Sequence, residues 1–171
     1  MKRTLILSLS LLTLAACMTA SDGGSASQAT VALASAAGDV RGSARIGDGA
    51  SGLQVSVAVE GLPAGTHGVH LHTTGRCDAP DFASAGGHWN PTARKHGRDN
   101  PDGAHHGDLP NIEIGADGRG RLSFTVPSAT LAQLMDQDGA ALVVHATADD
   151  YRTDPSGNSG GRIACGVVTR S

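Results

Sequence analysis

The histidines of this chain are concentrated in one stretch, residues 67–108, and this constrains the fold more than any other feature. Seven of the eight histidines lie there, and the eighth, His145, lies in a strand-like segment further along. The stretch ends at Asp108, three residues after His105. Histidine together with aspartate is a ligand set for first-row transition metals, and imidazole suits zinc and copper. We therefore expect a metal site in this stretch.

Two histidines of the stretch, His70 and His72, alternate with the apolar residues Val69 and Leu71. On a strand, alternate side chains leave opposite faces, so both imidazoles would leave one face while the apolar side chains enter the core. Two metal ligands would then stand side by side on one strand.

The part of the stretch after residue 88 is rich in glycine, proline and asparagine, which predicts a loop. A loop of this length in a small domain needs something to order it. A metal bound by three histidines and a carboxylate would be enough, because a closed four-ligand site contributes folding free energy directly.

The N-terminus reads as an export signal over residues 1–16. Lys2 and Arg3 precede the apolar run 5–14, and small residues lead into Cys17. The ending Leu-Ala-Ala-Cys resembles the lipobox of bacterial lipoproteins, so we expect cleavage before Cys17, lipid modification of that cysteine, and a periplasmic protein anchored to a membrane only by the lipid. The alternative is ordinary cleavage near Ala20, which would leave Cys17 as an unpaired thiol.

Residues 17–30 contain the lipidated cysteine and a Ser/Gly/Ala-rich segment typical of a flexible tether, and residues 31–171 form the folded domain. About 140 residues are enough for one domain with one core. Aromatic residues are few, so the core must come mainly from valine, leucine, isoleucine and alanine. The net charge of −3 argues against a nucleic-acid partner.

If Cys17 carries lipid, Cys77 and Cys165 remain, and in an oxidising compartment they can pair in only one way. Such a disulfide would stabilise the fold by about 4 to 5 kcal/mol on the chain-entropy model. The alternative is that Cys77 ligates a metal, although the histidines already suffice for that.

Short apolar and alternating segments predict about eight strands. The clearest is 53–60, where apolar residues occupy the odd positions. The others are 30–34, 40–46 followed by a turn at 47–49, the segment carrying His67 to His72, a hairpin of 112–114 and 121–126, 141–147, and 163–169. Ser128 could cap a short helix bearing Leu131, Leu134 and Met135. This pattern indicates an all-β protein, a Greek-key antiparallel sandwich or flattened barrel with long metal-binding loops.

From Val31 to Val168 the chain resembles the copper-zinc superoxide dismutases, and in particular their bacterial exported, lipoprotein members. The matching pieces, in order, are HGVHLH at 67–72, AGGHWNP at 85–91, KHG at 95–97, HHGDL at 105–109, LVVHATADD at 142–150, and GN at 157–158 running into GRIACGV at 161–167. Each piece alone is weak, whereas six in order make a chance match very unlikely.

The resemblance implies a superoxide dismutase that converts superoxide to dioxygen and hydrogen peroxide by Cu(II)/Cu(I) cycling. It assigns copper to His70, His72, His88 and His145, and zinc to His88, His96, His105 and Asp108. In this assignment His88 bridges the two metals. Arg162 matches the arginine that guides the anion to copper, Asp149 matches a carboxylate that orients His70 and His96, and His67 matches a structural histidine under the site.

Some assignments have alternatives in the sequence. Spacing alone allows His106 in place of His105 as a ligand, and the motif favours His105, leaving His106 facing solvent. Trp89 is expected to pack rather than to contact substrate, and Asp149 could be an ordinary surface carboxylate.

The loop 150–161 contains Arg152 but no lysine, so Lys95 and Arg98 are alternative sources of positive charge for steering. The rival functions are a protein that stores or delivers copper and zinc without turnover, and a copper-only member of the family. A homodimer is left open, because no surface stripe identifies an interface.

Overall fold

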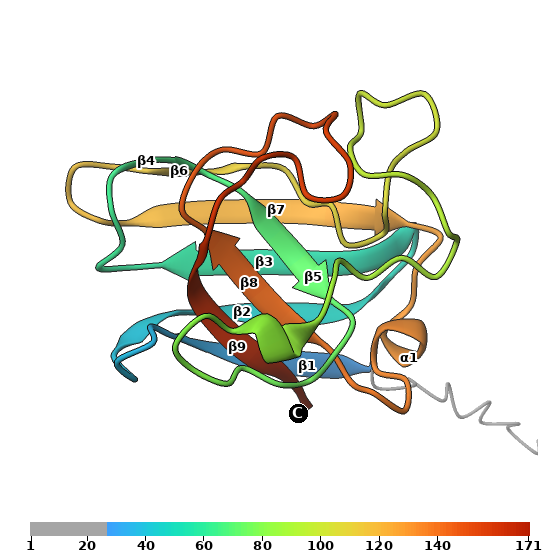
Figure 1. Ribbon diagram of the computed structural model, residues 1–171. Helices are drawn as coiled ribbons and strands as arrows, with labels where there is room; N and C mark the ends of the chain where they lie inside the picture. Colours follow the sequence, from blue (N-terminus) through green and yellow to red (C-terminus); the bar gives the residue numbers. More distant parts are fainter. Residues whose placement is uncertain (1–26) are drawn as a thin grey trace, which may run out of the picture.

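The computed structural model describes residues 27–171, and in this part of the chain nine strands form one antiparallel sheet that curls into a nearly closed barrel (Figure 1). Their order in the sheet is β4-β6-β7-β3-β2-β1-β9-β8-β5. The strands are β1 (Gln28–Ala34), β2 (Val40–Gly49), β3 (Gly52–Val59), β4 (Gly65–His67), β5 (Val69–His72), β6 (Ile112–Ile114), β7 (Gly120–Pro127), β8 (Ala141–His145) and β9 (Arg162–Arg170). The predicted all-β Greek-key fold is confirmed.

The core of the barrel is aliphatic, and strand alternation builds it. On β3, Leu53, Val55, Val57 and Val59 are at most 4% exposed, while the residues between them face outward or are less buried. This confirms the strand predicted from the odd-numbered apolar residues. Trp89 is 4% exposed and belongs to the same core cluster, so its predicted packing role is also confirmed.

The segment that carries His67, His70 and His72 is two strands rather than one. β4 pairs with β6 at one edge of the sheet, and β5 pairs with β8 at the other edge. The change of partner occurs at Gly68, whose N–H donates to the Thr147 carbonyl and whose carbonyl accepts from His145 N–H, both at 2.9 Å. Gly68 therefore separates His67 from the two histidines of β5.

Two strand ends differ from the prediction. Residues 47–49 continue β2 instead of turning, and Gly49 pairs with Gly52 across a turn at residues 50–51. A side chain at Gly52, which has φ +142°, would overlap the Val126 carbonyl, so glycine lets the two strands pair up to the turn.

The first strand begins at Gln28, because Gln28 pairs with Gly47 and its carbonyl accepts from Ser171 N–H. Residues 28–30 therefore belong to the sheet rather than to the predicted tether of residues 17–30. The predicted signal peptide, Cys17 and residues 18–26 lie outside the described residues.

The predicted short helix is present as α1 (Leu131–Leu134), but the capping residue is Thr130 and not Ser128. Thr130 and Gln133 form a reciprocal capping box, which Ser128, with a left-handed φ of 57°, is placed too early to make. No helix within residues 27–171 is long and apolar enough to cross a membrane.

Cys77 and Cys165 form a disulfide, as predicted, so Cys77 as a metal ligand is wrong. The bond joins residues 88 apart in sequence and ties the loop after β5 to β9. That loop contains the short 3-10 helix η1 (Ala83–Ala85), which leads directly into His88.

We predict that Cys77→Ser lowers the melting temperature by roughly 10 °C or more, because the lost cross-link is worth about 4 to 5 kcal/mol. Calorimetry of the metal-free protein measures the shift. Ser84→Ala is the matched control, since it removes a hydrogen bond to Asp78 N–H in the same loop but keeps the disulfide. Equal melting temperatures for Cys77→Ser and the control would contradict the role given to the disulfide.

Candidate metal centre

Among the described residues, three groups of side chains could hold a metal ion: two of them share His88, and the third, His70, His96 and Asp149, takes one histidine from each of the others. Within each group the candidate ligand atoms lie within 4.8 Å of one another. The first group is His70, His72, His88 and His145; the second is His88, His96, His105 and Asp108. These are the copper and zinc sets expected from the resemblance, so the structure brings every predicted ligand to one place.

The sheet and two isolated bridges position these ligands. Strand β5 carries His70 and His72, and β8, which pairs with β5, ends at His145. Single bridges join His70 to Asp108 and His72 to His88, so the loop ligands are fixed against β5 by backbone pairing. The loop between residues 89 and 111, called the zinc loop below after its predicted ligands, supplies the remaining members of the second group, His96, His105 and Asp108.

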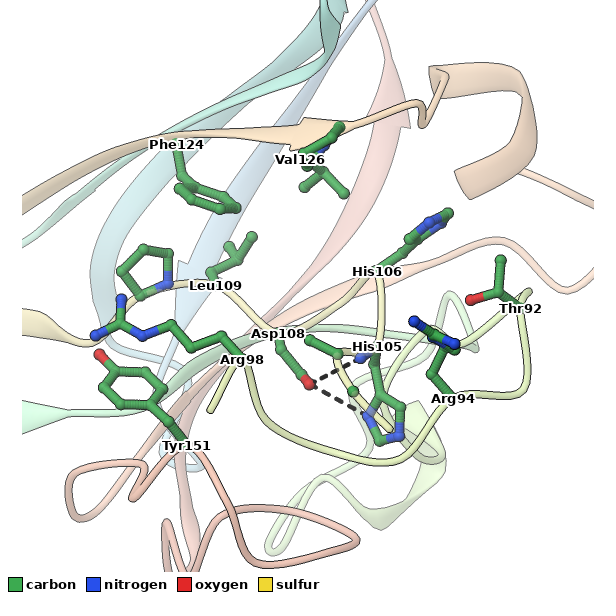
Figure 2. A pocket seen from close by; sticks show the side chains of 14 residues that line it. Thr92, Arg94, Arg98, His105, His106, Asp108, Leu109, Phe124, Val126 and Tyr151 are labelled. Atoms are coloured by element: carbon green, nitrogen blue, oxygen red, sulfur yellow. Dashed lines mark hydrogen bonds and ion pairs between the residues drawn. The ribbon is translucent and has the colours of Figure 1, made fainter. Parts of the chain in front are cut away.

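The second group surrounds one carboxylate. The Nδ1 atoms of His88, His96 and His105 lie 2.9, 3.0 and 3.2 Å from Asp108 Oδ1. Asp108 Oδ2 accepts from the backbone N–H groups of His105 and Gly97, and Figure 2 shows the contacts to His105. Three imidazoles and one carboxylate are a zinc ligand set, and their convergence fits a four-coordinate ion.

The first group points unpaired nitrogens inward. Among the described residues, Nδ1 of His70 and Nε2 of His72, His88 and His145 are buried without a hydrogen-bond partner. A buried polar atom without a partner is costly, and a bound cation removes that cost. These atoms therefore fit copper, for which imidazole is a suitable ligand.

The two ring nitrogens of His88 face different groups. Nδ1 lies 2.9 Å from Asp108 in the second group, whereas Nε2 is one of the unpaired atoms of the first. One imidazole can in this way contact two metal ions at once.

Burial keeps the imidazoles of the first group neutral. Desolvation lowers the pKa of His70 to about 3 and that of His145 to about 4, and it also lowers the pKa of His72 and His88. Neutral imidazole is the form that binds metals, so protons compete little for these nitrogens at neutral pH.

Asp149 connects the two groups through hydrogen bonds. Its Oδ2 lies 2.8 Å from His70 Nε2 and its Oδ1 lies 3.0 Å from His96 Nε2. Burial alone would raise the pKa of Asp149, but these bonds outweigh it and hold the pKa well below its usual range. Asp149 is 3% exposed, so the alternative that it is an ordinary surface carboxylate is wrong.

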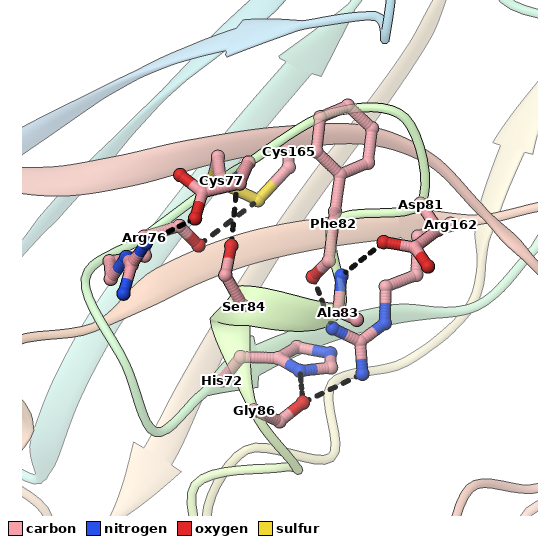
Figure 3. Close-up of a disulfide and its surroundings, with 11 residues drawn as sticks. His72, Arg76, Cys77, Asp81, Phe82, Ala83, Ser84, Gly86, Arg162 and Cys165 are labelled. Carbon is pink, nitrogen blue, oxygen red and sulfur yellow. Dashed lines mark hydrogen bonds and ion pairs between the residues drawn. A yellow bond between two sulfur atoms is a disulfide. The ribbon is translucent and has the colours of Figure 1, made fainter.

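A cavity of about 420 Å³ opens beside the first group, and Arg162 is one of the residues that line it. The guanidinium donates to the carbonyls of Phe82 and Gly86 at 2.5 and 2.7 Å, and the Gly86 carbonyl also accepts from His72 Nδ1 (Figure 3). Among the residues that line this cavity, Arg162 alone carries a permanent positive charge. The disulfide lies on the far side of the same loop and holds it against β9.

The remaining histidines stay outside both ligand groups. His67 is buried with Nδ1 2.8 Å from the His145 carbonyl and Nε2 3.0 Å from the Pro63 carbonyl, so it lies under the site as expected. His106 does not simply face solvent, as the sequence suggested. Its ring is half-buried, 5.3 Å from the Trp89 ring, because the loop folds back over the core at this point.

The other candidate steering residues do not line the cavity of Arg162. Lys95 Nζ lies 3.5 Å from Asp102, and the Arg98 guanidinium lies 3.8 Å above the ring of Tyr151. Arg152 is exposed on the loop surface.

Sequence reasoning missed a larger cavity, about 680 Å³ in volume, whose lining includes His105 and Asp108 of the second group. Figure 2 shows Leu109, Phe124 and Val126 on one side of it and Arg98 with Tyr151 on another. Its walls come from loop and strand segments far apart in sequence, and no local pattern marks them.

A family model described as copper/zinc superoxide dismutase matches residues 38–168. This chain belongs to that family. The superoxide dismutase-like protein YojM of Bacillus subtilis is 45% identical over 123 residues, covering 68% of this chain and 63% of that protein. A superoxide dismutase [Cu-Zn] of Aquifex aeolicus is 45% identical over 124 residues, covering 69% of this chain and 73% of that protein.

The solved copper/zinc superoxide dismutase from Brucella abortus superposes with a TM-score of 0.67 at 31% identity, covering 82% of this chain and 98% of that one. At the level of the family, these findings confirm three predictions: the resemblance, the enzyme class of an oxidoreductase acting on superoxide, and copper and zinc as cofactors.

We predict that the metal-free protein is most stable near neutral pH. The pKa values of His70 and His145 are depressed, so the unfolded chain takes up protons first and stability falls as the pH drops below about 6.5. For His96, burial is outweighed by Asp108 and Asp149, which raise the pKa to about 9. Its contribution is present below about pH 6.5 and is lost as the pH rises through about 9.

Calorimetry of the metal-free protein between about pH 5 and about pH 10 tests this profile. A melting temperature that stays constant over the range would contradict it.

Proposed function

We propose that this protein disproportionates superoxide, with copper held by His70, His72, His88 and His145 and zinc held by His88, His96, His105 and Asp108. The observation that carries the proposal is the placement of the two nitrogens of His88 in different ligand groups. A site that only stores metal needs no shared imidazole, whereas a shared imidazole joins a redox ion to a fixed one.

Copper supplies one-electron cycling between Cu(II) and Cu(I), and zinc, which has no redox chemistry, supplies a fixed charge and structure. In total, two superoxide ions and two protons give one dioxygen and one hydrogen peroxide. The chain's own part in this reaction is to bind the anion, to hold the ligands in place, and to deliver a proton.

His88 is the proposed proton carrier. Its Nε2 faces the first group and the cavity, while its Nδ1 remains at Asp108. Copper would supply the electron transfer; while it is not bound to the metal, Nε2 would carry one proton and give it to the peroxide product, and the second proton would come from water. Because Nδ1 stays anchored, the ring keeps its position while Nε2 gains and loses the proton.

Arg162 is the proposed anion guide. Two carbonyls fix its guanidinium on the cavity wall beside His72 and His145. A fixed cation in a partly desolvated cavity attracts a small anion and orients it, which raises the rate of productive encounter. Since Lys95 and Arg98 are engaged elsewhere, Arg162 supplies the local attraction.

The proposal extends to the location of the protein. We propose cleavage after residue 16, lipid attachment at Cys17, a tether that continues to the start of β1, and a folded domain that reaches residue 171. The Cys77–Cys165 disulfide supports export, because disulfides persist in oxidising compartments. The homodimer left open by the sequence stays a prediction, which sedimentation velocity would test.

The rival function is metal storage without turnover. It accounts for the histidines and for the bonds of Arg162 to the loop, but it gives no role to the positive charge of Arg162 at the cavity or to the two-sided placement of His88. A copper-only site is disfavoured because the second ligand group is complete.

The deciding experiment is superoxide decay catalysed by residues 18–171 loaded with one equivalent each of copper and zinc. Catalytic decay that disappears when copper alone is removed is the expected result. Decay no faster than that of free copper, with both metals tightly bound, would favour the storage function.

We predict that His88→Ala lowers activity and weakens binding of both metals, whereas Arg162→Ala keeps both metals and lowers activity about tenfold or more. The activity of Arg162→Lys should lie between that of the wild type and that of Arg162→Ala, because lysine retains the charge but loses the fixation by two carbonyls. Metal analysis and superoxide decay on the same samples measure both effects. Equal metal loss in His88→Ala and Arg162→Ala would contradict this division of roles.

A further inference from the structure

Within residues 27–171, Asp149 is the carboxylate that hydrogen-bonds an imidazole of each of the two ligand groups that share His88 without belonging to either group. Each of its oxygens serves a different imidazole, Oδ2 for His70 and Oδ1 for His96. A small displacement of Asp149 would therefore disturb both groups together. The contacts that hold Asp149 in place therefore also fix the positions of His70 and His96.

The backbone of Asp149 is held by the side chain of Asn111. Asp149 N–H donates to Asn111 Oδ1 at 2.8 Å, and Asn111 Nδ2 donates to the Asp149 carbonyl at 2.9 Å. One amide thus bonds the peptide groups on both sides of Asp149. Only a side chain with a donor and an acceptor at this spacing can make both bonds.

Tyr151 holds the same two residues from the other side. Its N–H donates to Asp149 Oδ1 at 2.7 Å, and its hydroxyl accepts from Asn111 N–H at 2.8 Å. Its left-handed φ of 61° is an uncommon conformation for a residue with a side chain, and it turns the chain back so that both bonds form.

The tyrosine is in turn held by the zinc loop. The Arg98 guanidinium lies over the Tyr151 ring, 3.8 Å from its centroid, and Figure 2 shows the two side chains together. The Tyr151 carbonyl accepts from Asp99 N–H at 3.1 Å. The neighbouring Gly97 N–H donates to Asp108 Oδ2. A continuous path of contacts thus runs from Asp108 to Asp149 without passing through an imidazole.

We propose that Asn111 and Tyr151 are positioning residues that hold Asp149 where it can orient His70 and His96 at the same time. The inference rests on the ligand assignment under Proposed function. It adds a second connection between the two metal groups, through the backbone of Asp149, beside the connection through His88.

Cobalt(II) bound at the zinc ligands is the probe, because its visible absorption reports a tetrahedral site. The variants are Asn111→Ala, which removes both bonds to the Asp149 backbone, and Tyr151→Phe, which removes only the hydroxyl. Asn100→Ala is the matched control: its amide joins the zinc loop to the Arg152 carbonyl but does not touch Asp149. Asp108→Ala tests the ligand assignment itself.

Three quantities are measured for each variant: the rate of cobalt release to a chelator, the electron paramagnetic resonance spectrum of bound copper(II), and the melting temperature of the metal-free protein. We expect Asn111→Ala to release cobalt about tenfold faster, at the lower end of the effect of removing a residue that orients a ligand. We expect a smaller acceleration for Tyr151→Phe, an altered copper spectrum in both variants, and neither change in Asn100→Ala.

The outcomes separate the positioning role from a general loss of stability. If Asn111→Ala and Tyr151→Phe behave like Asn100→Ala in cobalt release and copper spectrum, the positioning role is wrong, whatever happens to the melting temperature. If Asp108→Ala keeps the wild-type cobalt spectrum, the ligand assignment fails and this inference fails with it. If Asn111→Ala does not fold, Tyr151→Phe decides alone.

Discussion

The burial of seven polar side chains in one cluster beside the barrel is the constraint on which the rest of the structure depends. Each of these side chains is at most 9% exposed: His70, His72, His88, His96, His105, His145 and Asp149. Buried polar groups are costly unless each finds a partner. Asp149 and backbone carbonyls bond one nitrogen of His70, His72 and His145 and leave the other nitrogen unpaired for a metal.

The loops that cover this cluster are attached to it at several independent points. The disulfide and Arg162 fix the loop after β5, while Asp149 and Tyr151 connect the loop after β8 to the zinc loop. Gly157 allows this close packing, because any side chain there would overlap Asp149 and crowd His96 Nε2. The result is a rigid set of ligands whose geometry is fixed largely by the protein.

Local patterns predicted the parts of the structure that depend on local chemistry. The alternation along β3 and the placement of His70 and His72 at alternate positions of one strand both follow from the two-residue repeat of a β-strand, and both are found. The break at Gly68 and the turn at residues 50–51 depend on which strand lies opposite, which the sequence does not show. The cap at Thr130 is different, because Thr130 and Gln133 have the local spacing of a capping box, which the sequence contains.

The assignment of ligands to two metals came from the family motifs and not from spacing, which left His105 and His106 equivalent. Asn111 and Tyr151 escaped notice for a related reason. The bonds between Asn111 and Asp149 join residues 38 apart, and the bond from Tyr151 to Asp149 is made by the backbone N–H of Tyr151 and not by its side chain. Asparagine before a strand is ordinary in sequence, and only its position opposite Asp149 gives it a role.

The measurement that tests the central claim most directly is a crystal structure of the metal-loaded protein with anomalous diffraction recorded at the copper and zinc absorption edges. The account predicts a copper peak among His70, His72, His88 and His145, a zinc peak among His88, His96, His105 and Asp108, and the ring of His88 between them. A single peak, or two peaks that do not share His88, would contradict it.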